Sequence, residues 1–306
     1  MNFLQKLIAA AIFAFGLGCQ AEPNRYSENV NIANPEVDRI ENHGVAPRDR
    51  LLNPDLLASS VLVIDETSRE VLFEKNPDYS QPIASITKLM TAIVVLNEAQ
   101  PLDQILSVTK NDAFAARPTH SRLKAGARLS RSELLRLMLM ASENRAAVVL
   151  ARSYPGGLGA FVKCMNKTAA ALGLSSTRFA DPTGLNPGNL STARDLAMLV
   201  EHASRFDVIR AYSTTPEYAV SLRRARTTLF HNTNRLTRNA DWDIRLSKTG
   251  FISASGQCLV LQTAVAGRPM IMVILDSWGK GGRVEDAVRL KSWLEQRSER
   301  LVVARL

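Results

Sequence analysis

The chain has 306 residues and a formal net charge of +9, from 38 Lys and Arg against 29 Asp and Glu. Its 46% hydrophobic and 22% charged residues are ordinary for a globular protein and exclude disorder of the whole chain. Three cysteines are too few for a disulfide-rich mini-fold, and the only long apolar run, at the N-terminus, excludes a polytopic membrane protein.

The first 21 residues have the layout of a secretory signal peptide. A basic start is followed by the apolar stretch Leu7–Leu17, and the stretch Gly18–Ala21 supplies small residues for cleavage. We therefore expect export with cleavage after Ala21; the alternatives are a buried first helix or lipidation of Cys19. Lipidation is less favoured because Gly16 stands where a lipidation signal prefers Leu.

Residues 22–56 are expected to form a mobile leader, because they are polar, contain four prolines and show little periodicity. The remaining segment, 57–306, is expected to be a single domain. Within it, Cys164 and Cys258 would pair in an oxidising compartment only if their geometry allows it. The sequence leaves that question open.

The predicted fold begins with a hairpin over Ser60–Lys75, where apolar and polar residues alternate around a polar break at Glu66–Arg69. A set of helices follows, and one of them opens with the capping box Ser130-x-x-Glu133. The predicted helices cover Ile86–Asn97, Ser130–Met140, Asn144–Arg152, Leu158–Leu172 and Thr192–Ser204.

Short strands return in the C-terminal part of the chain. They are predicted over Tyr218–Val220, Thr227–Phe230, Ile244–Thr249, Cys258–Ala266 and Met270–Leu275. Gly267-Arg268 fits a tight turn between the last two, and Val284–Arg297 is predicted to be an amphipathic helix. Strands at both ends of the domain indicate an α/β (α+β) fold, with an antiparallel sheet covered by helices and an inserted all-helical lobe.

Three short motifs with reactive side chains follow one another along the chain. Ser85-Ile-Thr-Lys88 begins the first buried helix, Ser142-Glu-Asn144 lies between two helices, and Lys248-Thr-Gly250 ends a strand. Alone, each has a plainer explanation, such as a helix cap for Ser85 or a surface position for Lys248. Together and in this order, they are typical of serine acyl-enzymes.

The first two motifs supply candidate catalytic groups. Lys88 can reach the Ser85 hydroxyl because residues three apart share a helix face. A serine needs a base, and lysine serves as one only when it is neutral. Burial and a nearby cation such as Lys248 lower the pKa of a lysine. Ser142 can relay a proton to a leaving amine, and Asn144 can hold Lys88 and a substrate amide by hydrogen bonds.

The third motif suits substrate binding. Lys248 and Thr249 offer a point charge and a hydroxyl to a substrate carboxylate. Gly250 lets an extended peptide approach the strand edge and add to it as another strand. The backbone N–H groups of Ser85 and Phe251 complete the candidate site as an oxyanion hole.

These motifs resemble those of the penicillin-binding enzymes and class A β-lactamases. Longer segments are similar to the low-molecular-mass D-alanyl-D-alanine carboxypeptidase family, and the resemblance covers about Ser60 to Leu294. The similar segments are Pro82–Met90, Ser142–Ala146, Tyr154–Gly157, Asp181–Leu185, Ser191–Leu196 and Lys248–Phe251.

The resemblance implies a β-lactamase/transpeptidase-like fold and a periplasmic peptidoglycan hydrolase. In such an enzyme Ser85 would be the acyl-ester nucleophile, Lys88 the base, Ser142 a proton relay and Lys248 part of the substrate site. Peptidoglycan cross-linked peptides would be the substrates, and β-lactam antibiotics would be covalent inhibitors. Arg283 lies where some relatives bind a terminal carboxylate; the alternative for it is a solvated arginine at a helix start.

Two branches of the family remain open. Carboxypeptidase relatives carry a second β-rich domain after the catalytic one, whereas only Phe251–Leu306 follows the third motif here. That favours the endopeptidase branch, which cuts the D-alanyl–meso-diaminopimelate cross-link, over trimming of the terminal D-alanine. A β-lactamase is less favoured, because Ser175–Asn189 contains no glutamate to hold a deacylating water and Asp181 is expected to shape a turn.

The net charge also permits a basic binding protein without catalysis. The cations are scattered and lack an aromatic stacking series, so no nucleic-acid partner is expected. We expect instead a weak association with anionic wall or membrane surfaces, which salt would screen. No zinc-like spacing of Cys and His and no glycine-rich phosphate loop occurs, so neither a metal nor a cofactor is expected.

Overall fold

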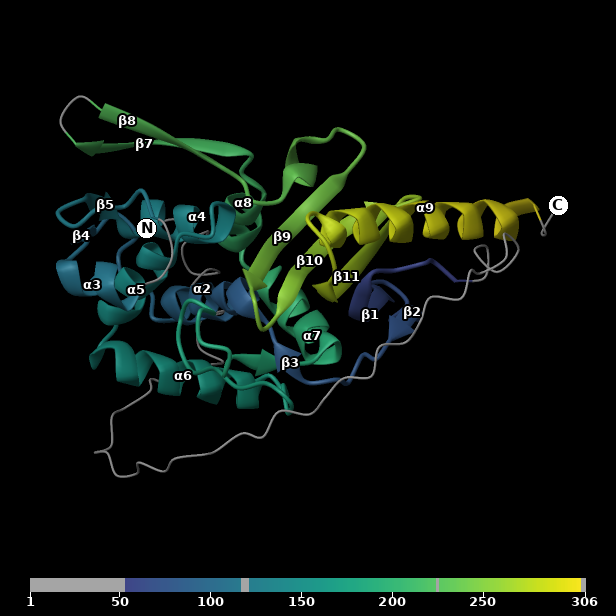
Figure 1. The fold of residues 1–306 in the computed structure, drawn as a ribbon, viewed down its shortest axis with the longest axis horizontal. Coiled ribbons are helices and arrows are strands. Elements are labelled where there is room, and N and C mark those ends of the chain that lie inside the picture. Colours follow the sequence, from purple (N-terminus) through teal and green to yellow (C-terminus); the bar gives the residue numbers. More distant parts are fainter. Residues whose placement is uncertain (1–52, 117–120, 224–225, 304–306) are drawn as a thin grey trace, which may run out of the picture. The chain divides into compact units, whose positions relative to one another are not determined.

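In the computed structural model, an antiparallel sheet of five strands forms the centre of the fold, in the order β2-β1-β11-β10-β9 (Figure 1). Its strands are β1 (Ala58–Asp65), β2 (Val71–Lys75), β9 (Asp243–Ile252), β10 (Gly256–Val265) and β11 (Arg268–Ser277). The N-terminal β1 pairs with the C-terminal β11, so that Val61 lies opposite Ile274. This pairing confirms the predicted closure of the sheet by strands from both ends of the domain.

The structure describes residues 53–116, 121–223 and 226–303, all of which belong to the unit Asn42–Leu306. The predicted signal peptide, with Cys19, and the predicted leader up to residue 52 lie outside the described residues, and these predictions stay predictions. None of the described helices is both long and apolar enough to cross a membrane.

The alternation of side chains along the strands divides the apolar core between the two faces of the sheet. Val61 of β1 and Leu259 of β10 pack, with their neighbours on that face, against α9 (Gly282–Val303). The residues next to them, Leu62 and Val260, belong to a larger core on the opposite face. That core is filled mainly by the helices inserted between β2 and β9, which confirms an inserted helical lobe. The prediction that the lobe is all-helical is wrong, because three short strand pairs lie in the same segment.

The inserted segment consists of helices and short strand pairs. Its helices are α2 (Lys88–Asn97), α3 (Lys110–Ala115), α4 (Arg131–Met140), α5 (Asn144–Arg152), α6 (Gly157–Ala171), α7 (Ala193–Ala203) and α8 (Asp207–Thr214), with the 3-10 turns η2 (Ala84–Thr87) and η3 (Arg235–Arg238). The strand pairs are β3 (Gln81–Pro82) with β6 (Leu190–Ser191), β4 (Ile105–Ser107) with β5 (Arg128–Ser130), and β7 (Glu217–Arg223) with β8 (Arg226–His231).

The predicted helices and strands are all present. The structure adds two helices and places one turn a residue earlier than predicted. The strands predicted at 218–220 and 227–230 form a hairpin of their own, β7–β8, outside the central sheet. The helices α3 and α8 were not predicted, because six and eight residues give too few turns for a clear periodicity. The turn between β10 and β11 is Ala266-Gly267, one residue earlier than predicted, and both residues have positive φ.

Cys164 and Cys258 are both free thiols in the structure. Cys164 lies on α6, whereas Cys258 lies in β10 and is fully buried. Burial raises the pKa of the Cys258 thiol to about 11, so this side chain stays protonated and packs as a small apolar group. The pairing that the sequence left open is therefore not made in this structure.

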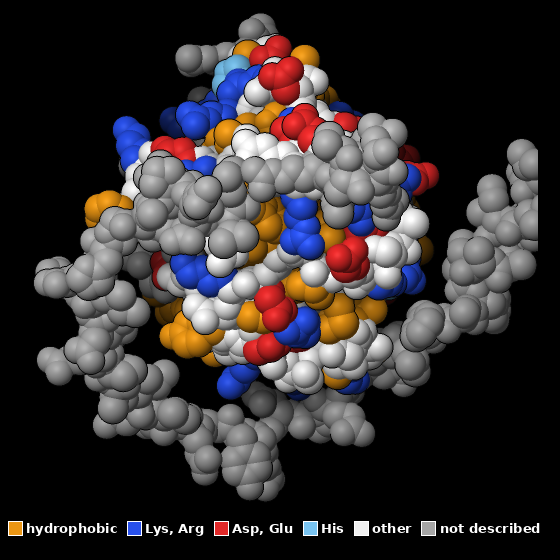
Figure 2. Space-filling view, turned by 90° about the vertical axis from the view of Figure 1, so that its right-hand side faces the viewer, with side chains coloured by type: hydrophobic (Ala, Val, Ile, Leu, Met, Phe, Trp, Pro, Cys, Tyr) orange, Lys and Arg blue, Asp and Glu red, His pale blue; other side chains and the backbone are white. Residues whose placement is uncertain are grey.

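Charges of both signs are mixed on the surface. Figure 2 shows one face of the molecule, on which Lys and Arg side chains lie among Asp and Glu side chains. Arg194 donates to Asp78 at 2.7 Å, and Arg69 pairs with Glu201. Exposed pairs of this kind contribute little to the stability of the fold and weaken in salt.

Replacing Ser130 tests how the sequence directs the start of α4. Its Oγ accepts a hydrogen bond from the Glu133 N–H at 3.1 Å, and Glu133 Oε2 accepts one from the Ser130 N–H at 2.8 Å. Ser130→Ala removes half of this capping box and should lower the free energy of unfolding by about 1 kcal/mol, measured by urea denaturation. Ser176→Ala, at an exposed turn, is the control, and an equal loss in both variants would contradict the assignment.

Candidate active site

The segment before α2 places a serine hydroxyl against a buried amine. Ser85 lies in η2 and Lys88 opens α2, so their side chains are one turn apart on the same face. Lys88 Nζ lies 2.7 Å from Ser85 Oγ, as the spacing predicts. The 3-10 turn was not predicted; it begins at Ala84, whose φ of 45° lies in the left-handed region.

Two further oxygens hold the amine of Lys88. Its Nζ lies 2.6 Å from Asn144 Oδ1 on α5 and 2.6 Å from the backbone carbonyl of Thr183. Both oxygens can only accept hydrogen bonds, so they occupy two N–H groups of a neutral amine. The lone pair is then left for the hydroxyl proton of Ser85. The predicted contact of Asn144 with Lys88 is present, whereas the contact from Thr183 was not predicted.

Burial lowers the pKa of Lys88 to about 7, against opposing effects from the carboxylates of Asp181 and Glu143. The side chain is fully buried, and a charged amine loses its hydration there. The expected cause was burial together with the charge of Lys248. In the structure burial is the dominant cause, and the charge effect is seen at Lys248.

Lys248 lies on β9 and its side chain points toward Ser142. Its Nζ donates to Ser142 Oγ at 3.0 Å and to the backbone carbonyl of Thr249 at 2.8 Å. Burial lowers the pKa of Lys248 well below its usual value, and the nearby Lys88 and Arg283 lower it further. Ser142 itself has a φ of 57°, a conformation that costs energy in a residue with a Cβ.

Glu143 was not predicted to belong to the site. It is buried, and its carboxylate accepts from Ser121 Oγ at 2.6 Å and from the Arg122 N–H at 3.4 Å. Burial raises the pKa of this carboxyl group. Because Glu143 stands between Ser142 and Asn144, its anchoring to the 121–122 segment fixes the backbone that presents both side chains. The serine–any residue–asparagine pattern that identifies this motif specifies nothing at its middle position, so it could not predict the anchoring by Glu143.

The loop before β6 is built around Asp181. Its Oδ1 accepts from the Thr183 and Gly184 N–H groups, each at 2.6 Å, and its Oδ2 accepts from the Asn186 N–H at 2.8 Å. These bonds match the expected turn-forming role of Asp181. The turn directs the Thr183 carbonyl toward Lys88.

Two glycines press against the backbone that carries Ser85. A Cβ at Gly184 would lie 1.9 Å from the Ala84 carbonyl oxygen, and the φ of Gly184 is +83°. A Cβ at Gly250 would lie 2.9 Å from the Ile83 carbonyl oxygen and 3.2 Å from the Ser85 nitrogen. Gly250 was predicted to admit a substrate strand; the structure gives it a second reason, which is the close packing of η2 against β9.

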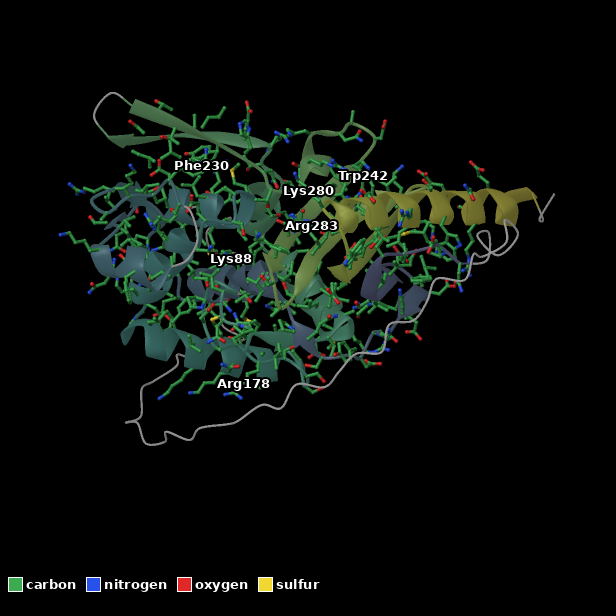
Figure 3. All side chains as sticks on the ribbon, viewed as in Figure 1. Lys88, Arg178, Phe230, Trp242, Lys280 and Arg283 are labelled. Atoms are coloured by element: carbon green, nitrogen blue, oxygen red, sulfur yellow. The ribbon has the colours of Figure 1, made fainter. Side chains whose placement is uncertain are left out.

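The edge strand β9 and the start of α9 carry the other predicted binding residues. Thr249 Oγ1 lies 2.6 Å from Thr233 Oγ1, and Phe251 is 58% exposed. Arg283, at the start of α9, donates from Nη1 to the Gly250 carbonyl at 2.7 Å, so it is not a free solvated arginine. Figure 3 labels Lys88 and Arg283, which lie on the two sides of β9 in this view.

The three motifs therefore converge on one site, at the contact of α2, the Ser142 segment and β9. It contains a hydroxyl with an adjacent base, a second hydroxyl held by a buried amine, and an open strand edge. Within 53–116, 121–223 and 226–303, no group of three or more His, Cys, Asp or Glu side chains is placed to hold a metal ion.

The chain is similar to known peptidases over most of its length. Residues 48–279 match the model of the D-alanyl-D-alanine carboxypeptidase family. The chain is 47% identical to the D-alanyl-D-alanine endopeptidase of Pseudomonas aeruginosa, over 80% of this chain and 79% of that protein. It is 42% identical to the D-alanyl-D-alanine endopeptidase of Escherichia coli, over 79% of this chain and 78% of that protein.

The fold is similar to that of a solved enzyme. The crystal structure of the Streptomyces K15 DD-transpeptidase superposes with a TM-score of 0.73 at 26% identity, covering 78% of this chain and 97% of that one. The superposition confirms the predicted transpeptidase-like fold.

Gly184→Ala tests the packing around the segment that carries Ser85. The new methyl group would collide with the Ala84 carbonyl, so η2 must move and the rate of covalent labelling by penicillin should fall by at least about 100-fold. Gly173→Ala is the matched control, because Gly173 has a similar φ of +74° but open space around it. That variant should lose about 1 kcal/mol of stability and keep its labelling rate. Equal labelling by both variants would refute the steric argument.

Proposed function

Because the chain belongs to the D-alanyl-D-alanine carboxypeptidase family of serine peptidases, we propose that it is a D-alanyl-D-alanine endopeptidase. Its substrate is the D-alanyl–meso-diaminopimelate cross-link of peptidoglycan. Relatives at 42% and 47% identity carry the endopeptidase name, which favours this reaction. The observation that carries the chemistry is the 2.7 Å contact between Ser85 Oγ and the buried amine of Lys88.

In the proposed acylation step, Ser85 Oγ attacks the D-alanyl carbonyl carbon while neutral Lys88 takes the hydroxyl proton. The N–H groups of Ser85 and Phe251 stabilise the oxyanion of the tetrahedral intermediate. The C–N bond then breaks, and the proton passes from Lys88 through Ser142 to the leaving amine. Lys248 supports this relay, because its donation to Ser142 Oγ leaves the Ser142 proton free to move.

In the proposed deacylation step, Lys88 passes a proton from water to Ser85. Water attacks the ester carbonyl and gives a proton to Lys88, and the Ser85 alkoxide leaves and recovers that proton. The D-alanine-terminated stem is released with a new carboxylate. A β-lactam would acylate Ser85 by the same first step, which makes such compounds covalent inhibitors of this enzyme.

The edge strand β9 is the proposed substrate platform. It is the last strand of the sheet order, so its outer edge can pair with an extended peptide. Lys248, Thr249 and Arg283 lie along it and provide the donors for a substrate carboxylate. Arg283 reaches this edge through its hydrogen bond to the Gly250 carbonyl.

D-alanyl-D-alanine carboxypeptidase activity is the alternative function, and the name of the matching family favours it. It would use the same acyl-enzyme but release a terminal D-alanine. β-Lactamase activity has less support. Asp181 is the only acid in the 175–189 loop, and its oxygens are engaged by the loop's own N–H groups rather than by a water site.

The proposed location is the periplasm, reached through the predicted signal peptide. A net charge of +9 then favours weak attraction to anionic wall or membrane polymers rather than to nucleic acid. The mixed charges in Figure 2 accord with a diffuse, salt-sensitive attraction.

The pH dependence of acylation tests Lys88 as the base. Because burial lowers its pKa to about 7, the ammonium form predominates below that pH and Ser85 lacks a base. The second-order rate constant for labelling by fluorescent penicillin should rise about tenfold per pH unit up to about pH 7 and then level off. A flat profile between about pH 5 and 9 would exclude Lys88 from this role.

Ser85→Ala tests the nucleophile and the reaction together. The variant should show neither penicillin labelling nor cleavage of cross-linked muropeptides, because no ester can form. The intact protein should convert cross-linked dimers to monomers faster than it releases free D-alanine, measured by chromatography with time. Ser175→Ala, at an exposed position, should behave like the intact protein.

Each possible result of that experiment has a separate meaning. Labelling that persists in Ser85→Ala refutes the nucleophile assignment. Release of D-alanine without loss of dimers would make the protein a carboxypeptidase. Rapid and repeated hydrolysis of nitrocefin would make it a β-lactamase.

A further inference from the structure

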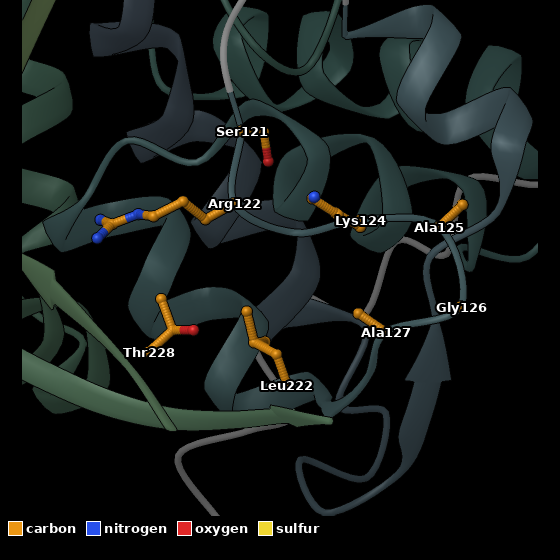
Figure 4. A pocket seen from close by; sticks show the side chains of 8 residues that line it. All are labelled: Ser121, Arg122, Lys124, Ala125, Gly126, Ala127, Leu222 and Thr228. Atoms are coloured by element: carbon orange, nitrogen blue, oxygen red, sulfur yellow. The ribbon is translucent and has the colours of Figure 1, made fainter. Parts of the chain in front are cut away.

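A cavity of about 540 Å³ opens beside the candidate active site, between the 121–127 loop and the β7–β8 hairpin (Figure 4). The loop contributes Ser121, Arg122, Lys124 and Ala127, and the hairpin contributes Leu222 and Thr228. The residues of the first two motifs and of β9 do not line it. Its volume lies in the range of sites that hold a small molecule or a peptide segment, which is larger than a single ion needs.

The lining has a definite chemical character. Arg122 and Lys124 are cations, and none of the described residues that line the cavity is acidic. Ser121 and Thr228 add hydroxyl groups, while Leu222 and Ala127 add an aliphatic surface. This combination suits a ligand that has both carboxylates and short hydrocarbon segments.

The two cations have different surroundings. The Arg122 guanidinium donates to the Leu229 carbonyl and lies 3.9 Å from the centre of the Phe230 ring, so it is held against β8. Lys124 is exposed, and within the described part of the chain its ammonium group has no ion-pair partner. Figure 4 shows its amine turned toward the side of the cavity where Ser121 lies.

The wall of the cavity is joined to the catalytic segment by direct bonds. Ser121 Oγ donates to Glu143 at 2.6 Å, and the Arg122 N–H donates to the same carboxylate. Arg145 Nη1, on α5, donates to the Leu123 carbonyl at 2.7 Å. Glu143 and Arg145 flank Asn144 in the chain, so the loop that lines the cavity has a fixed position relative to Lys88.

We propose that this cavity is a substrate subsite that binds a carboxylate-bearing segment of the cross-linked stem peptides, with Lys124 as its counter-ion. The inference rests on the proposed function, because it assigns a part of the same substrate to a place beyond the scissile bond. A peptide that lies along β9 and extends past Ser142 would approach the 121–127 loop, because Ser121 and Arg122 are hydrogen-bonded to Glu143 next to Ser142. A subsite in this cavity would favour an acidic cross-linked peptide over a small β-lactam, because only the peptide is long enough to enter it.

The test measures binding separately from cleavage. In a Ser85→Ala background, which prevents turnover, calorimetry gives the Kd of a cross-linked muropeptide dimer with free stem carboxylates. The same dimer with amidated stem carboxylates is the second ligand. Lys124→Gln removes the charge and Lys124→Glu reverses it, while Lys163→Gln on α6 is the exposed control that keeps the cavity intact.

We expect Lys124→Gln to weaken binding of the free-carboxylate dimer about fivefold and Lys124→Glu to weaken it more. Neither substitution should change binding of the amidated dimer. With Ser85 present, penicillin labelling should be unchanged in both variants, because a β-lactam does not extend into the cavity. Lys163→Gln should leave every measurement unchanged.

Two results would overturn the inference. One is equal binding of free and amidated dimers by the protein with Lys124, and the other is an equal loss for both dimers on substitution. Cleavage of dimers by the intact protein would then still support the proposed function. Carboxylate-dependent binding without any cleavage would reject the proposed function and keep the subsite.

Discussion

The burial of the Lys88 amine is the constraint on which the rest of the site depends. A charged amine in a dry interior costs several kcal/mol, so the protein either neutralises it or surrounds it with acceptors. Here it does both, since the pKa falls to about 7 while Asn144 and Thr183 supply two acceptor oxygens, and Ser85 Oγ lies 2.7 Å from the amine. The same burial that penalises a charged lysine favours the neutral amine that the proposed mechanism needs beside Ser85.

The fold brings the polar groups of the site together from segments that are far apart in the chain. Asn144 begins α5 in the lobe, Thr183 belongs to a turn shaped by Asp181, and Lys248 reaches across from the edge of the sheet. The site therefore lies at the contact of two layers, and neither the lobe nor the sheet would form it alone. Glu143 extends this arrangement outward, because its buried carboxylate links the catalytic segment to the 121–127 loop.

The motifs and their periodicity were enough to predict the sheet, the lobe, and Ser85, Lys88, Ser142 and Lys248 as one group. The parts that were not predicted depend on backbone geometry. The Thr183 carbonyl has no residue-specific signal, because every residue carries one. The anchoring of Glu143 depends on a partner 22 positions away, which no local pattern encodes. The η2 turn depends on Gly184 and Gly250, whose roles require the distance between two backbones.

Those two glycines also limit which substitutions the protein can accept over generations. Every other amino acid brings a Cβ, which would overlap the Ala84 carbonyl at one position and crowd the Ile83 carbonyl at the other. Substitution that preserves the geometry around Ser85 is therefore excluded at Gly184 and Gly250. It is possible at exposed side chains such as those of Phe251 and Ala125.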